Sequence, residues 1–130
     1  MVTDPLTGLR LLIVEDEYYL AEDARTVLID GGAEVLGPVA TAAQARALIE
    51  GDPAIDGVLL DINLRGEMAF DVADMLQARA IPFAFVTGYD PLALPGRFAA
   101  TPRLEKPLSG SQLLATVETL GLQKGTGGSH

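Results

Sequence analysis

Cysteine is absent from the 130-residue chain, and its single histidine, His130, is the last residue. The absence of cysteine excludes a disulfide framework and thiolate chemistry, and one histidine cannot form a histidine-rich metal site. Basic residues are also scarce, since nine Lys and Arg face eighteen Asp and Glu, which gives a net charge of −9. Because such a chain is poorly suited to neutralise a phosphate backbone, we expect no nucleic-acid binding.

Long hydrophobic runs are missing as well. No apolar stretch approaches the roughly 18 residues that cross a bilayer, and the N-terminus "MVTDPLTGLR" lacks the basic and apolar regions of a secretory signal. We therefore expect a soluble, cytoplasmic protein with no membrane contact. The length suits one domain. We place an N-terminal extension at 1–8, the folded domain at 9–122, and a Gly-rich tail at 123–130 that is disordered or a cloning remnant.

What the chain does contain is an alternation of apolar runs and amphipathic segments. The apolar runs predict five strands, at 9–15, 33–40, 54–61, 81–87 and 101–106. Helical spacing predicts helices at 16–30, 42–51, 67–80 and 110–122, and we assign the Tyr18-Tyr19 pair to packing. Alternating strands and helices indicate an α/β fold with a parallel sheet covered on both faces.

Prolines mark two irregular places in this pattern. Gly37-Pro38 interrupts the second strand, which suits the edge of a sheet better than its centre. Pro91, Pro95 and Pro102 fall where a fourth helix would follow the fourth strand. Because proline disrupts a helix interior, we expect a short or irregular, mobile fourth helix there.

Polar side chains stand where the predicted strands end. Glu15 and Asp16 follow the first strand, Asp61 closes the third, Thr87 the fourth and Lys106 the fifth. The carboxyl ends of parallel strands meet at one edge of a sheet, where ligands bind. Three carboxylates in contact repel one another, and Mg²⁺ relieves that repulsion because it prefers oxygen ligands.

The same patch has the parts for phosphoryl transfer. Lys106 supplies a positive charge and Thr87 a hydroxyl donor for a phosphoryl group that arrives at Asp61. Taken alone, each residue has a simpler explanation: Asp61 and Thr87 could cap turns, Glu15-Asp16 could complement a helix dipole, and Lys106 could be a solvated surface residue. Their joint placement favours a functional site.

Four segments of the chain resemble the receiver domain of two-component response regulators, over about 9–122. They are "LLIVEDE", "GVLLDINL", Thr87 and "EKP", which contains Lys106. The resemblance implies a flavodoxin-like (βα)5 three-layer sandwich with strand order 2-1-3-4-5. It implies a phosphoprotein that acts in phosphorelay signal transduction.

The resemblance also assigns the site. It implies that a sensor histidine kinase donates a phosphoryl group to Asp61, and that Thr87 and Lys106 act on that group. Mg²⁺ or Mn²⁺ would be bound by Asp16, Asp61 and the backbone carbonyl of Asn63, with Glu15 acting mainly through water. Asn63 and Tyr89 would tune hydrolysis of the phosphoryl group, and Gly88 would leave the site open.

The stretch "PFAFVTGYD" resembles a receiver subgroup named for a Phe-Ala-Thr-Gly-Tyr motif, with Val86 in the alanine place. Members are often single-domain receivers paired with histidine kinases of the HWE class, so we expect such a kinase and an unidentified downstream protein as partners. The oligomeric state is left open. The chain departs from typical receivers at Arg103, where an aromatic residue normally reports phosphorylation.

Two other functions compete with this hypothesis. A phosphorylation-independent adaptor would use the fold only for docking, and it would not need the site residues. A haloacid-dehalogenase-like phosphatase also uses a strand-end Asp, a Thr, a Lys and Mg²⁺. Its nucleophile motif needs a second acid two residues later, where this chain has Asn63. We therefore expect a phosphoacceptor signalling domain that catalyses only its own phosphorylation and dephosphorylation, not an enzyme.

Overall fold

The structure, a computed structural model, describes residues 4–88 and 94–128, with side chains described up to residue 121. The strands are β1 (Arg10–Val14), β2 (Glu34–Val39), β3 (Gly57–Asp61), β4 (Asn63–Leu64), β5 (Glu67–Met68), β6 (Phe83–Thr87) and β7 (Arg103–Glu105). The helices are α1 (Tyr18–Asp30), α2 (Ala42–Gly51), α3 (Phe70–Ala78), the 3-10 helix η1 (Gly96–Phe98) and α4 (Gly110–Gly128). Among the described residues, no helix combines the length and the apolar character that a membrane span requires.

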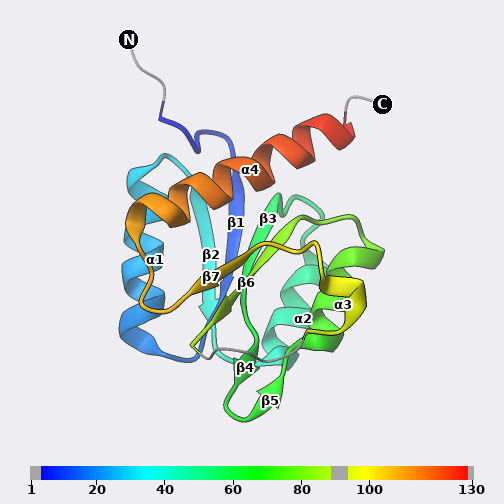
Figure 1. The fold of residues 1–130 in the computed structure, drawn as a ribbon. Helices are drawn as coiled ribbons and strands as arrows, with labels where there is room; N and C mark the ends of the chain where they lie inside the picture. The colour runs from blue at the N-terminus through cyan, green and yellow to red at the C-terminus, as the bar shows by residue number, and fades with distance from the viewer. Residues whose placement is uncertain (1–3, 89–93, 129–130) are drawn as a thin grey trace.

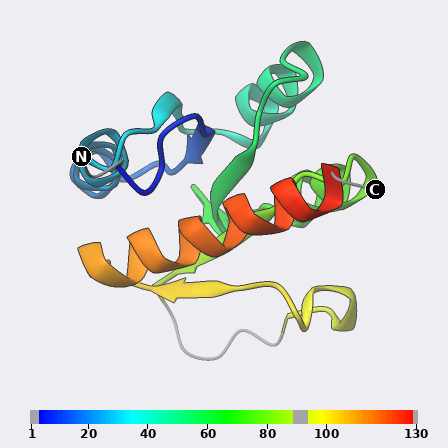
Figure 2. The same cartoon turned by 90° about the horizontal axis from the view of Figure 1, so that it is seen from above.

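A five-stranded sheet runs through the molecule in the order β2-β1-β3-β6-β7, and all four strand pairs are parallel. With β6 and β7 as the fourth and fifth sheet strands, the predicted flavodoxin-like order 2-1-3-4-5 is confirmed. The Gly37-Pro38 strand β2 lies at one edge, as predicted, and β7 lies at the other (Figure 2).

Helices cover both faces of this sheet (Figure 1). The reason is visible in β1, where Leu12 and Val14 join one buried cluster while Leu11 and Ile13 join the other. Alternate side chains of a strand point to opposite faces, so an unbroken apolar run needs a covering layer on each side. Helices α2 and α3 pack on the first face, and α1 and α4 pack on the second.

The connection from β6 to β7 contains no α-helix within its described residues, 88 and 94–102. That stretch holds only η1, whose Phe98 is fully buried. The predicted short or irregular fourth helix is thus confirmed for these residues, where Pro95 and Pro102 bracket a single turn. Tyr89 and Pro91 lie outside the described residues.

Between β3 and α3 the structure contains a small hairpin that the sequence did not predict. We expected a helix over 67–80, but α3 begins at Phe70, and Glu67–Met68 pairs antiparallel with Asn63–Leu64. Arg65 and Gly66 form the turn with φ values of 53° and 85°. Positive φ at both turn positions makes the chain reverse into a hairpin after β3. Because residues in the left-handed region cannot be part of an α-helix, α3 begins only after the hairpin.

Three further expectations need correction. Helix α4 continues to Gly128, where we expected a tail from residue 123, although glycine is a poor helix former; residues 129 and 130 lie outside the described residues. Leu6, which we placed in an N-terminal extension, is fully buried, and its N–H donates to Gly31 O at 2.8 Å. Tyr18 and Tyr19 are 68% and 82% exposed, so they do not pack in the core.

Candidate functional site

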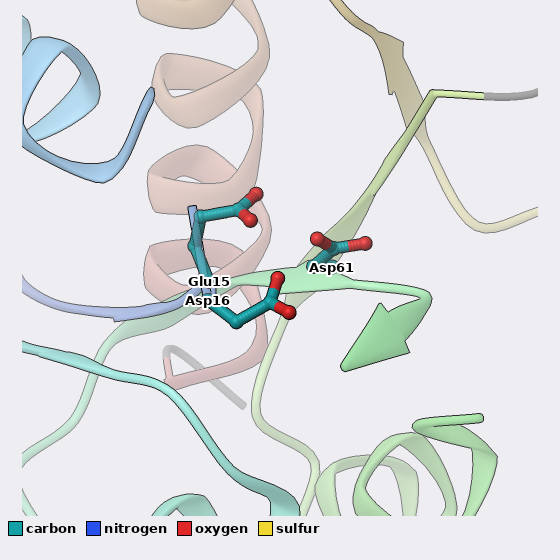
Figure 3. A group of neighbouring side chains, drawn as sticks. All are labelled: Glu15, Asp16 and Asp61. Carbon is teal, nitrogen blue, oxygen red and sulfur yellow. The ribbon is translucent and has the colours of Figure 1, made fainter. Parts of the chain in front are cut away.

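The ends of four neighbouring sheet strands meet at one edge of the sheet. Glu15 and Asp16 follow β1, Asp61 is the last residue of β3, Thr87 the last of β6, and Lys106 follows β7. A ligand oxygen from each of Glu15, Asp16 and Asp61 lies within 4.8 Å of the others, and Figure 3 shows their carboxylates converging. The structure therefore brings together the acids that the sequence predicted to meet.

Lys106 is surrounded by carboxylates. Its Nζ lies 3.0 Å from Asp61 Oδ2 and 3.4 Å from Glu15 Oε1. A third carboxylate, Glu17 Oε1, lies 3.2 Å from the same ammonium. Glu15 and Asp61 are almost completely buried, whereas Glu17 is largely exposed. The lysine thus supplies positive charge within a strongly negative pocket.

Burial and the neighbouring charges shift the pKa values of Glu15 and Lys106. Burial, together with the neighbouring Asp61 carboxylate, raises the pKa of Glu15 to about 8. Burial lowers the pKa of Lys106, but the surrounding carboxylates outweigh that effect and its pKa lies above the usual value. Lys106 therefore stays charged at neutral pH, while Glu15 holds a proton more readily than an exposed glutamate.

Backbone amides fix two of the carboxylates. The Asn63 N–H donates to Asp61 Oδ1 at 3.0 Å, and the Glu17 N–H donates to Glu15 Oε2 at 3.0 Å. Each bond comes from a residue two positions later in the chain, which is the local geometry of a turn that follows a strand. The oxygens on the other side of each carboxylate face Lys106.

The other predicted site residues lie around the same pocket, with one exception. Thr87 is buried, and both Thr87 and Gly88 line the pocket. A Cβ built on Gly88 would lie 3.4 Å from Lys106 Cδ, an ordinary contact, so the glycine leaves space without being sterically required. Asn63 lines the pocket, and its Oδ1 accepts the Gly66 N–H at 2.8 Å. Tyr89 lies outside the described residues.

Two residues at the pocket escaped the sequence analysis. Glu17 contacts Lys106, and Arg65 lines the pocket from the hairpin turn, with its N–H donating to Asp16 Oδ2 at 3.0 Å. A charged residue directly after the Glu15-Asp16 pair was a usable signal for Glu17. Arg65 gave little signal, because two-residue strands are too short for a periodic pattern.

The donor set fits a hard divalent cation. Glu15 Oε1 is buried and accepts no hydrogen bond from the part of the chain that the structure describes, although Lys106 Nζ is 3.4 Å away. Such an orphaned oxygen is costly unless a ligand or ion satisfies it. Three carboxylates without nitrogen or sulfur donors suit Mg²⁺ or Mn²⁺. The acidic group Glu15, Asp16 and Asp61 could therefore hold a metal.

The chain is similar to known proteins among the solved structures. No protein-family profile matches the chain, and no curated protein matches it. Among solved structures, SdrG from Sphingomonas melonis is 38% identical, with a TM-score of 0.77, over 89% of this chain and 97% of that one. A response regulator receiver protein from Sinorhizobium medicae is 27% identical, with a TM-score of 0.76, over 89% and 96% of the two chains.

A third similar structure is the response regulator PhyR from Brucella abortus, with 28% identity and a TM-score of 0.76. The match covers 96% of this chain and 53% of PhyR. The chain belongs to the response regulator receiver family. This receiver resembles the Phe-Ala-Thr-Gly-Tyr subgroup in its "FAFVTGY" stretch. Receiver domains act in response regulator signalling, with histidine kinases and downstream effectors as partners, so the family is one of signalling domains.

Proposed function

We propose that this receiver is a single-domain response regulator that accepts a phosphoryl group from a sensor histidine kinase onto Asp61 in a Mg²⁺-dependent reaction. One observation carries the proposal: the buried Asp61 carboxylate lies 3.0 Å from Lys106 and within 4.8 Å of two further carboxylates, at the open end of the sheet. Neither a core carboxylate nor a turn cap needs such a set of neighbours.

The transfer exchanges one bond for another. An oxygen of Asp61 forms a bond to phosphorus as the bond from phosphorus to the donor's histidine nitrogen breaks, and the nitrogen keeps the electron pair. Asn63 N–H holds Asp61 Oδ1 in place. Lys106 neutralises charge on the transferring group, and the Thr87 hydroxyl donates to one of its oxygens.

Glu15, Asp16, Asp61 and the backbone carbonyl of Asn63 would hold the Mg²⁺, with Glu15 acting mainly through water. When bound, the ion supplies positive charge to the phosphoryl oxygens and offsets the repulsion among the carboxylates. The residues at the Asn63 and Tyr89 positions set how fast the phosphoryl group is hydrolysed. Gly88 leaves room beside Lys106 for the group.

The new charge on Asp61 changes partner binding. Thr87 and Lys106 rearrange around the phosphoryl group, and the surface that a partner contacts changes as a consequence. Arg103 stands where receivers usually carry an aromatic residue, so the readout in this chain does not depend on an aromatic side chain there. The kinase belongs to the HWE class, as in the subgroup that the chain resembles.

Acetyl phosphate, a small phosphodonor, tests the proposal directly. With Mg²⁺ and acetyl phosphate, the protein should gain the mass of one phosphoryl group, and chelation of Mg²⁺ should prevent the gain. Asp61→Asn should abolish it, because an amide is no nucleophile towards phosphorus. Asp74→Asn, which removes a carboxylate from the exposed surface of α3, serves as the matched control and should react like the wild type.

The alternatives predict different results. A protein that never gains mass, yet still binds its partner, would be a phosphorylation-independent adaptor. Steady turnover of a small phosphomonoester would indicate a phosphatase of the haloacid-dehalogenase type. Phosphorylation that persists in Asp61→Asn would place the acceptor elsewhere.

A further inference from the structure

The hairpin turn next to the acid pocket has an unusual residue at its first position. Turns with positive φ at both positions favour Asn-Gly, Asp-Gly or Gly-Gly, because a bulky side chain is unfavourable in the left-handed region. Here the pair is Arg65-Gly66, with φ values of 53° and 85°. Residues held in unfavourable backbone conformations concentrate at functional sites, so an arginine at this position points to a functional role for its side chain.

Polar contacts fix this turn to the site. Arg65 N–H donates to Asp16 Oδ2 at 3.0 Å, across 49 residues of sequence, and Gly66 N–H donates to Asn63 Oδ1 at 2.8 Å. The hairpin strands lie just beyond the carboxyl ends of the sheet strands (Figure 1). As a result Arg65 lines the same pocket as Asp61 and Lys106.

The charges of the pocket give Arg65 a distinct role. Lys106 is already in contact with the carboxylates of Glu15, Glu17 and Asp61. Arg65 is exposed, and its guanidinium takes no part in the ion pairs formed within residues 4–88 and 94–128. An anionic phosphodonor that approaches this acidic rim meets repulsion, and Arg65 is a cation at the rim that pairs with no carboxylate of the described residues.

We infer that Arg65 binds the anionic phosphoryl group of the donor as it approaches Asp61, before the transfer. A guanidinium presents paired N–H donors that match phosphate oxygens, and it is always charged. The hydrogen bond to Asp16 fixes the backbone of Arg65 in the hairpin. The hairpin therefore both contacts the acid site and carries the cation that binds the donor. The inference rests on the proposed function, and it adds a residue that selects phosphoryl donors by charge.

Three variants test this inference. Arg65→Asn removes the guanidinium but keeps the backbone N–H, and Asn tolerates positive φ, so the turn is retained. Arg65→Lys keeps the charge without the paired donors. Arg79→Asn removes the same charge from an exposed residue directly after α3, and it controls for the change in net charge.

The measurement is the rate constant of phosphorylation by acetyl phosphate with Mg²⁺, at low and at high salt. We expect Arg65→Asn to lower the rate constant on the order of tenfold at low salt, and we expect the difference to shrink at high salt because salt screens the charge. Arg65→Lys should restore part of the rate. Arg79→Asn should stay within about twofold of the wild type, since it is remote from the pocket.

Two further readouts separate donor binding from a structural role. The affinity for Mg²⁺ and the melting temperature of Arg65→Asn should equal or exceed those of the wild type, because Asn-Gly suits the turn.

Equal rate constants for Arg65→Asn and wild type at every salt concentration would overturn the inference while leaving the proposed function intact. A rate loss that accompanies weaker Mg²⁺ binding would also overturn it, since Asp16 would then be the cause. A wild type that is never phosphorylated would overturn the proposed function, and the inference with it.

Discussion

Glu15 shows how one residue is adapted to its position. Its side chain is only 3% exposed, it faces a lysine and an aspartate, and one of its oxygens accepts no hydrogen bond from the described residues. Burial and Asp61 together raise its pKa from 4.5 to about 8. Between pH 4.5 and about 8, Glu15 of the folded, metal-free protein therefore binds a proton that Glu15 of the unfolded chain has released.

This shift predicts a pH dependence of stability. Because the folded protein binds the extra proton, the Glu15 contribution to the free energy of unfolding is fully present below about pH 4.5 and is lost as the pH rises to about 8. The slope reaches at most about 1.4 kcal/mol per pH unit for one proton. Urea unfolding with EDTA at several pH values measures it.

Glu15→Gln is the comparison for this experiment, because the amide is similar in size and does not titrate. The gain in stability of Glu15→Gln over the wild type should grow from pH 5 towards pH 8, given the raised pKa of Glu15. A constant difference across that interval would show that Glu15 is already ionised in the folded protein.

At the scale of elements, residues 94–102, which precede β7, are held against the core without an α-helix. Phe98 in η1 is fully buried, and its ring lies 5.4 Å from that of Phe85 and 5.8 Å from that of Phe70, measured between centroids. Arg97 adds an ion pair with Asp74 on α3, with 2.7 Å between Nε and Oδ1. Both groups of that pair are about half exposed.

The apolar contact should dominate this anchor. Phe98→Ala should lower the free energy of unfolding by about 3–5 kcal/mol, since it leaves a cavity in the core. Asp74→Asn should cost at most about 1 kcal/mol, because water screens an exposed pair. Urea unfolding measures both. Tyr19→Ala removes a ring of similar size at a position that is 82% exposed, and it should change little.

A result in which Asp74→Asn costs as much as Phe98→Ala would contradict this account. It would mean that the ion pair, rather than the four-phenylalanine cluster of Phe70, Phe83, Phe85 and Phe98, fixes the segment.

At the scale of the whole molecule, the N-terminal residues belong to the folded unit. Leu6 is fully buried in the cluster formed with α1 and α4, and its side chain lies against Gly31, where an added Cβ would come within 3.0 Å of it. The boundary that the sequence suggested at residue 9 follows the first apolar run, and a single leucine among polar residues gave no periodic signal.

Leu6→Ala should therefore destabilise the domain by about 2–5 kcal/mol, as other buried leucines do. Thermal unfolding of the variant, with Thr7→Ala as a neighbouring exposed control, measures the difference. Equal melting temperatures for Leu6→Ala and the wild type would show that residues 4–8 are not part of the core.

The sequence predicted most of the sheet because its strands are buried on both faces and read as unbroken apolar runs. The meeting of Glu15, Asp16, Asp61, Thr87 and Lys106 followed from the rule that parallel strands end at one edge. Glu17 and Arg65 were missed for different reasons. Glu17 reaches Lys106 across 89 residues of sequence, and Arg65 sits in a turn whose residue type is not the preferred one.

The hairpin bond to Asp16 also limits the coordination chemistry of the site. Asp16 Oδ2 accepts the Arg65 N–H, so the other oxygen of this carboxylate would bind a cation more readily. Asp61 has both oxygens engaged, because its Oδ1 accepts the Asn63 N–H and its Oδ2 lies 3.0 Å from Lys106 Nζ. Carboxylates whose oxygens already accept hydrogen bonds would suit a small octahedral ion that retains water better than Ca²⁺, which takes more oxygens and often takes carboxylates bidentately.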